Sequence, residues 1–289
     1  MENRDFSSRI LRAVSIVHLR NIPVMILLLV CAYFMAMPFL WMMSASFRPI
    51  GESYRLPPNI LPDHLDFEAY SEALGSGVPF LQMYWNSLVV ATLTTAGVLI
   101  SSSLAAFAFA RLEFRTREFL FGFMLLGLMV PPALVLIPTY FGYAKIGLLD
   151  TQLGLALPAM ASPFGVFMIR QFMLNQPRAL EEAALIDGAS YFTIFWRVTL
   201  PQLGPALATL TIITFMTSWN NFVSPFVLIT TWDKMTLPAG VVALQGVMGS
   251  ARLSVVMAAA TMSILPLLLV FLIAQRFIVE SITMSGVKG

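Results

Sequence analysis

The acidic residues that could serve a function gather in one short segment between two long apolar runs. Glu181 and Glu182 begin a helical pattern, the small residues Ala183 and Ala184 follow, and Gly188 interrupts it. A second short helical pattern then ends at a proline. Small side chains let a partner approach a helix closely, so the segment predicts a water-facing helical hairpin that receives another protein.

Local signals define both arms of this hairpin. Pro177 suits the first turn of a helix, because the N–H that proline lacks has no partner there. Glu181 and Glu182 near that end favour the helix dipole. Gly188 permits a left-handed turn that a side chain would resist. Ser190 can cap the second arm.

The second arm carries an aromatic stripe. Phe192, Phe195 and Trp196 are spaced i, i+3 and i+4, so they share one face of a helix. Such a stripe needs a cover, which is either the protein's own spans or a groove on a partner.

Catalytic chemistry finds little support in the sequence. Both histidines, His18 and His64, fall in water-exposed segments, so no buried Ser/His dyad is available. No HExxH motif, paired-cysteine metal site or GxxxxGK[ST] phosphate loop occurs. The single Cys31 is expected to be a packing residue. We therefore expect a non-catalytic chain that binds no cofactor and does not hydrolyse ATP itself.

The elements that must position the hairpin are membrane spans. Apolar residues make up 58% of the chain and charged residues 11%. Runs near the ~20 residues that a helical span needs predict an all-α polytopic membrane protein with six transmembrane helices. We place them at residues 23–46, 87–110, 119–141, 153–169, 203–229 and 254–274.

Charge placement predicts the orientation. With the N-terminus in the cytoplasm, the inner segments carry twelve Lys and Arg residues and the outer ones five. The positive-inside rule then places both termini in the cytoplasm. The regions outside the spans are a basic arm at 1–22, an extracytoplasmic segment at 47–85 and a tail at 276–289. The arm is expected to rest on the lipid surface.

The six predicted spans carry no ionisable residue in their interior. Arg170 lies at a span edge, where its side chain can reach the water. Ion-coupled transporters usually keep such residues at depth. The energy for transport is therefore expected to come from outside the membrane.

The spacing around the hairpin resembles the cytoplasmic loop of ABC importer permeases. The motif begins with Glu-Ala-Ala at 182–184, and three residues separate it from Gly188. Nine residues then separate Gly188 from Val198, and one more residue separates Val198 from Leu200-Pro201. Further segments are similar to carbohydrate importers, in particular the second permease of the maltose type. They are Ala105–Leu112, Ser218–Phe222, Thr236-Leu237-Pro238 and the final Gly286–Gly289.

The resemblance implies a type I ABC importer permease fold in a bacterial inner membrane, with a five-helix core at 86–275. It also implies partners: two ABC ATPase subunits that use ATP and Mg²⁺, a second and unlike permease, and an extracytoplasmic solute-binding protein. The loop at 176–201 would dock on an ATPase. The docking residues would be Glu182, Ala183, Ala184, Asp187, Gly188, Phe192, Phe195, Trp196 and Pro201.

A sugar is the cargo that the resemblance implies. Candidate pathway residues pair an aromatic face with amides and hydroxyls: Thr217, Ser218, Trp219, Asn220 and Asn221. Such residues also join neighbouring helices, which is the competing interpretation. Two alternatives for function stay open. One is an ABC permease for a polyol or glycerol phosphate, and the other is a channel or facilitator that needs no ATP. The near-neutral charge gives no reason to expect nucleic-acid binding.

Overall fold

The computed structural model describes residues 3–49, 62, 64–75, 79–248 and 252–286, with side chains only between 22 and 272. Much of the predicted extracytoplasmic segment at 47–85, and the side chains of most of the arm and of the tail, lie outside the described residues. The chain forms two compact units. The first comprises residues 1–70 and 251–261, and the second residues 71–250 and 262–289.

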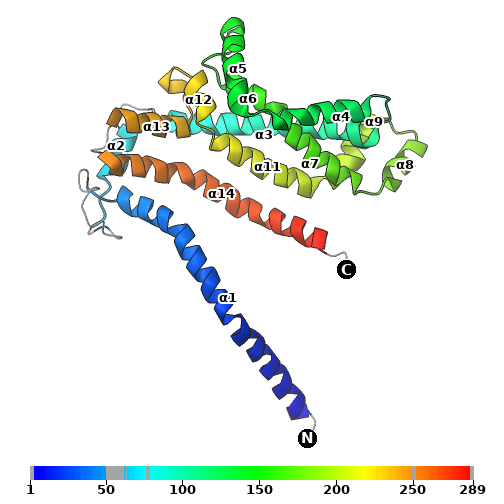
Figure 1. The fold of residues 1–289 in the computed structure, drawn as a ribbon, viewed down its shortest axis with the longest axis horizontal. Helices are drawn as coiled ribbons and strands as arrows, with labels where there is room; N and C mark the ends of the chain where they lie inside the picture. Colours follow the sequence, from blue (N-terminus) through cyan, green and yellow to red (C-terminus); the bar gives the residue numbers. More distant parts are fainter. Residues whose placement is uncertain (1–2, 50–61, 63, 76–78, 249–251, 287–289) are drawn as a thin grey trace. The chain divides into compact units, whose positions relative to one another are not determined.

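Every regular element in the described part of the chain is a helix (Figure 1). In chain order these are α1 (Asn3–Ser46), α2 (Glu68–Gly75), α3 (Phe80–Arg111), α4 (Arg117–Leu126), η1 (Gly127–Met129), α5 (Pro132–Ile146), α6 (Gln152–Met160), α7 (Pro163–Leu174), α8 (Ala179–Ile186), α9 (Tyr191–Ile194), η2 (Phe195–Thr199), α10 (Leu200–Gln202), α11 (Gly204–Trp219), α12 (Val223–Leu228), η3 (Trp232–Lys234), α13 (Leu237–Met248) and α14 (Leu253–Gly286).

The described helices provide up to six membrane spans. Unbroken helices of sufficient length and apolarity cover Ile22–Ser46, Phe80–Arg111 and Leu253–Leu272. Three bent helix pairs bring the number to six if each pair is one span. This confirms the predicted all-α polytopic fold class.

The third predicted span, 119–141, is wrong as a single helix. Arg117–Met129 and Pro132–Ile146 meet at an angle of 97°. Val130 is extended, with φ −84° and ψ 116°, because Pro131 disfavours a helical conformation in the residue before it. Pro132 then starts α5 at a position where a missing N–H costs nothing.

The fourth and fifth predicted spans also differ from single helices. Within 153–169 the chain bends by 42° between α6 and α7, where the Ser162 hydroxyl accepts the N–H of Gly165 at 3.0 Å. Within 203–229, α11 ends at Trp219. The Asn221 carboxamide accepts the N–H of Ser224, which offers the backbone an alternative to continuing the helix.

In the first unit, the predicted arm and first span form one helix, α1, with Pro23 and Pro38 inside it. Its C-terminal end is held by aromatic and hydroxyl contacts. The Ser46 hydroxyl lies 2.7 Å from the Tyr70 hydroxyl, and the Phe47 ring packs 5.3 Å from that of Phe67.

In the second unit, α3 lies beside α6, α7 and α11 (Figure 1). An apolar, tightly packed core is built from α3, α7, α11 and three residues that precede α11 in the chain. A Cβ added at Gly165 of α7 would collide with the side chain of Ser102 on α3, so glycine allows this close crossing. The core residues are Val98, Ala106, Phe107, Ala110, Val166, Ile169, Met173, Ile194, Phe195, Leu203, Ala206 and Leu210.

The N-terminal end of α3 is fixed by buried hydrogen bonds. Asn86 donates to the carbonyls of Asp233 and Met235 at 2.8 and 3.0 Å. The Ser87 hydroxyl accepts the N–H of Leu237 at 2.7 Å. These bonds join α3 to the segment that leads into α13.

A second polar cluster fixes the connection between α5 and α6. Asp150, with a φ of 58°, accepts the N–H groups of Thr230 and Thr231 at 3.0 Å. It also accepts the Thr231 hydroxyl at 2.7 Å and pairs with Lys234 at 3.1 Å. Burial alone would raise the pKa of this carboxyl, but these bonds outweigh it and lower the pKa well below its ordinary value.

Candidate functional site

The predicted hairpin is present as α8 and a second arm that runs through α9, η2 and α10. Gly188 has the left-handed φ of 80° that the sequence predicts. The N–H of Gly188 bonds to the carbonyl of Leu185, and that of Ala189 to the carbonyl of Ala184, which satisfies the last carbonyls of α8. The Ser190 hydroxyl caps the second arm by accepting the N–H of Thr193 at 3.3 Å.

The tip of the hairpin carries exposed apolar side chains. Ile186 is 87% exposed and Phe192 70%. The Phe192 ring lies 6.1 Å from that of Trp196, so these two aromatics form one patch. Glu182, Ala183 and Asp187 are exposed on the same hairpin. We name the exposed residues 182, 183, 186, 187, 192 and 196 the tip surface.

Four of the predicted docking residues are not part of the tip surface: Ala184, Phe195 and Pro201, together with Gly188, which forms the turn. Phe195 is only 3% exposed, and its ring packs 5.3 Å from that of Phe107 on α3. Ala184 is half-buried against the same core. Pro201 does not end the second arm, because the helix continues to Gln202.

The second arm that carries the aromatic stripe is not a regular α-helix throughout. Phe195–Thr199 forms a π-helical turn, in which the N–H of Leu200 bonds to the carbonyl of Phe195. A π turn holds an additional residue and shifts the face on which later side chains lie. Phe195, the first residue of this turn, contacts the core, while Trp196 points about 100° away and remains exposed.

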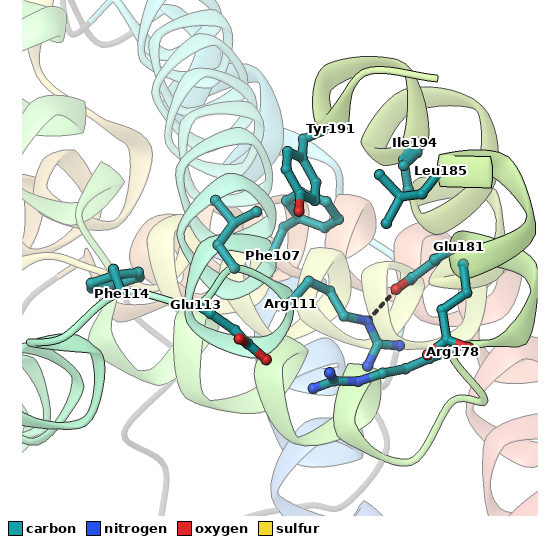
Figure 2. A pocket seen from close by; sticks show the side chains of 11 residues that line it. Phe107, Arg111, Glu113, Phe114, Arg178, Glu181, Leu185, Tyr191 and Ile194 are labelled. Atoms are coloured by element: carbon teal, nitrogen blue, oxygen red, sulfur yellow. Dashed lines mark ion pairs between the residues drawn. The ribbon is translucent and has the colours of Figure 1, made fainter. Parts of the chain in front are cut away.

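A buried polar triad joins the hairpin to the end of α3, and Figure 2 shows the ion pair within it. The Glu181 Oε2 and Arg111 Nε atoms form an ion pair at 2.7 Å, with side chains 10% and 5% exposed. The Thr199 hydroxyl donates to Glu181 Oε1 at 3.0 Å. Arg111 also donates to the carbonyl of Gln176 at 3.3 Å. We name Arg111, Glu181 and Thr199 the buried triad.

A cavity of about 510 Å³ separates the hairpin from the residues that follow α3 (Figure 2). Its lining mixes aromatic side chains with both signs of charge. The Arg178 guanidinium on its wall donates to the carbonyl of Ala110 at 3.2 Å. The lining residues are Phe107, Arg111, Leu112, Glu113, Phe114, Arg178, Glu181, Glu182, Leu185, Tyr191 and Ile194.

The prediction that the Arg170 side chain reaches the water is wrong. Arg170 does not extend to the water but is 8% exposed. Its guanidinium lies 4.0 Å from the centre of the Phe121 ring and 3.2 Å from Glu118. Arg170 also donates to the carbonyl of Phe109, so it joins α7 to α4 and α3.

A second cavity, of about 440 Å³, lies between α3, α6, α7 and α11. No residue among those lining it is charged. The Thr94 and Thr236 hydroxyls are buried and have no hydrogen-bond partner among the described residues. The polar lining residues are Ser87, Thr94, Ser162, Thr214, Thr217, Ser218, Asn221 and Thr236.

The five predicted pathway residues divide around this cavity. Thr217, Ser218 and Asn221 line it. Trp219 is 2% exposed and packs elsewhere, with its ring stacked on Phe215 and its Nε1 donating to the carbonyl of Ser263. The exposed Asn220 donates to the carbonyl of Met216 within its own helix.

The buried triad was missed by sequence reasoning, and only one signal could have suggested it. Glu181 lies three and four positions before Ala184 and Leu185, so the three residues share one face of α8. Two of them are apolar, so this face could be buried. Nothing in the sequence indicates that Arg111, 70 positions earlier, would meet that face. The hydroxyls of Thr94 and Thr236 were missed because both residues lie within or beside apolar runs.

The fold and these two cavities can be compared with known proteins. Residues 97–284 match the family described as binding-protein-dependent transport system inner membrane component. This match covers the core of the second unit, the whole hairpin and part of α14.

Individual relatives agree with the family match. The arabinooligosaccharides transport system permease protein AraQ of Halalkalibacterium halodurans is 33% identical, over 89% of this chain and 93% of the relative. The sn-glycerol-3-phosphate transport system permease protein UgpE of Brucella abortus is 34% identical, over 86% and 90%.

A solved structure has the same fold over nearly the whole chain. It is that of a bacterial ABC transporter involved in the import of the acidic polysaccharide alginate. One of its chains has a TM-score of 0.75 and 25% identity, covering 93% of this chain and 97% of the other. With its described spans and its matched core, this chain belongs to the family of binding-protein-dependent transport system inner membrane components and is an ABC transporter permease.

Proposed function

We propose that this chain is the permease subunit of an ATP-driven sugar importer and that the tip surface docks on an ATPase subunit. The observation that carries this proposal is the exposure of Ile186 and Phe192 on a hairpin that is itself anchored by a buried ion pair. Exposed apolar side chains rimmed by polar ones are typical of protein interaction sites.

Charge supports a partner with basic residues at this surface. Glu182 and Asp187 are exposed beside the apolar tip. Glu182 also lines the cavity behind the hairpin, together with Glu113. Complementary charges on an ATPase would fix the orientation of docking.

The proposed complex contains two ATPase subunits, a second and unlike permease, and an extracytoplasmic solute-binding protein. The ATPases use ATP and Mg²⁺, and this chain binds no cofactor. Docking on ATPases requires the hairpin in the cytoplasm. The twelve inner against five outer basic residues support that orientation, with both termini inside.

A sugar or oligosaccharide is the cargo that the second cavity favours. Its lining offers hydroxyls and one carboxamide, and the buried Thr94 and Thr236 hydroxyls have no hydrogen-bond partner among the described residues. Buried polar groups without partners are costly, so a hydroxyl-rich solute would satisfy them. A glycerol phosphate, the cargo named for one relative, would favour positive charge, which this lining does not offer.

The experiment that tests the proposal is a mild-detergent pull-down of the tagged chain from its native membranes, with mass spectrometry of the proteins that accompany it. We expect an ATPase, a second permease and a solute-binding protein. Calorimetric titration of that binding protein with arabinotriose and with glycerol 3-phosphate then distinguishes the two cargo classes. Recovery of the chain alone, together with ATP-independent solute flux in liposomes, would replace the importer with a facilitator.

A further inference from the structure

The hairpin is fastened to α3 at both of its ends through one residue. Arg111, the last residue of α3, donates to the carbonyl of Gln176, just before the first arm. It also pairs with Glu181, which in turn accepts the Thr199 hydroxyl from the end of the second arm. The buried triad therefore joins the start of the hairpin, its first arm and its second arm to one helix end.

The buried triad resists movement of the hairpin relative to the end of α3, because the charges of its ion pair are buried. A buried ion pair gives little net stability compared with apolar side chains of similar volume. Separating its partners, however, leaves an uncompensated buried charge, which is strongly unfavourable. The hairpin and the end of α3 are thus expected to move together, supported by the Phe107–Phe195 contact one turn away.

The same helix forms a wall of the second cavity. Ser87, Val90, Thr94 and Val98 of α3 all line it. At a rise of about 1.5 Å per residue, α3 extends ~48 Å from the triad to its other end. Almost two turns inside that other end, Asn86 donates to the carbonyls of Asp233 and Met235. A displacement of the hairpin would therefore reach the cavity through a continuous helix.

We propose that the buried triad is the positioning link that transmits movement of the hairpin to α3 and so to the cavity wall. Arg111 and Glu181 act through the geometry that they fix between the two elements, and they touch neither solute nor nucleotide. The proposal rests on the proposed docking of an ATPase at the tip surface. It adds the residues that convert docking into a change at the cavity.

The experiment uses the whole complex and a reporter thiol in the cavity. The single native cysteine is removed by Cys31→Ala, and Ala159→Cys places a thiol in the lining. Its rate of labelling by a methanethiosulfonate reagent is measured without nucleotide and after trapping with ATP and vanadate. With the triad intact we expect about a tenfold change, the size that a shift between two conformations can give.

The decisive variant is Arg111→Met with Glu181→Leu, which replaces the pair by apolar side chains. We expect this variant to assemble with the ATPase into a complex that still hydrolyses ATP. The labelling rate of the cavity thiol, however, should no longer respond to nucleotide. A response equal to that of the complex with the intact triad would overturn the proposal. Should this variant fail to reach the membrane, Glu181→Gln provides the same test, since it removes the charge but can still accept the Thr199 hydroxyl.

Arg170→Met with Glu118→Leu is the matched control. It removes another ion pair near the same end of α3, at 3.2 Å, that does not contact the hairpin. We expect the nucleotide response to persist in this control, and its loss would also overturn the proposal. A chain with the triad intact that binds no ATPase would instead refute the proposed function itself.

Discussion

Glu181 and Glu182 are neighbours in the chain, yet their side chains have opposite surroundings. Glu181 is buried in an ion pair with Arg111, whereas Glu182 is exposed at the tip surface. Successive residues of an α-helix point about 100° apart, so one can face the core while the next faces a partner. The two carboxylates therefore have separate roles, one in anchoring the hairpin and one in docking.

Asp150 leads to a prediction about pH. Its lowered pKa means that its bonds stabilise the fold fully above the unfolded pKa of about 4. This stabilisation is lost as the pH falls toward the lower pKa of the folded state. We expect Asp150→Asn to lower the thermal midpoint by a constant amount at neutral pH, and by a shrinking amount below about pH 4.

The measurement is tryptophan-fluorescence melting of the purified protein in detergent between neutral and acidic pH. Lys234→Met is the companion variant, because it removes one of the four bonds that Asp150 accepts. Its effect should be smaller and should shrink over the same pH range. If the difference in thermal midpoint between Asp150→Asn and the unsubstituted protein grew on acidification, the assigned direction of the pKa shift would be contradicted.

At the scale of elements, apolar runs predicted where the spans lie but not where they bend. A hydropathy pattern records polarity alone, and the Pro131-Pro132 pair lies inside an apolar run. The bend of 97° follows instead from the backbone restriction that proline places on Val130. Proline pairs inside predicted spans therefore deserve to be treated as breaks.

The crossing of α3 and α7 predicts a position-specific effect of one methyl group. Gly165→Ala should destabilise the protein by about 1–3 kcal/mol, because an added Cβ would collide with Ser102 in a packed core. Thermal melting in detergent measures this effect. Ser102→Ala in the same chain should recover part of the loss by removing the hydroxyl that is in the way.

Gly122→Ala is the matched control on α4. A Cβ there would meet nothing within 4 Å, so only the helix propensity changes. We expect its thermal midpoint to stay equal or to rise, since alanine favours a helix over glycine by up to about 1 kcal/mol. If Gly165→Ala and Gly122→Ala lowered the thermal midpoint equally, the close-crossing explanation would be refuted.

At the scale of the whole molecule, the tip surface gives a prediction about assembly. Glu182→Lys should reduce uptake by about tenfold or more, because like charges facing each other across an interface cost several kcal/mol. Gly188→Val should have a similar effect, because valine resists the φ of 80°. Both variants should still reach the membrane. The measurements are uptake in cells and recovery of the ATPase in a pull-down.

Charge reversal at Lys145, an exposed residue of α5, controls for a general effect of charge. We expect Lys145→Glu to retain uptake and ATPase recovery. Normal uptake by Glu182→Lys and Gly188→Val together would exclude docking at the tip surface.

How much of the site was predictable depends on the distance between interacting residues. The Gly188 turn and the Ser190 cap follow from local chemistry, and both were predicted. The ion pair of Arg111 and Glu181 links residues 70 positions apart, so no local pattern could reveal it. Phe195 was assigned to the docking surface because it shares helical spacing with Phe192 and Trp196. Its contact with Phe107, a residue far away in the sequence, shows that it faces the core instead.

The π turn also makes the length of the second arm significant. Phe195–Thr199 holds an additional residue between the exposed Phe192 and α11. Removing any one residue there would restore a regular α-helix and rotate everything before it by about 100° relative to everything after it. The hairpin would keep nearly all of its side chains and present them in the wrong direction. This segment should therefore tolerate substitution better than any change in the number of its residues.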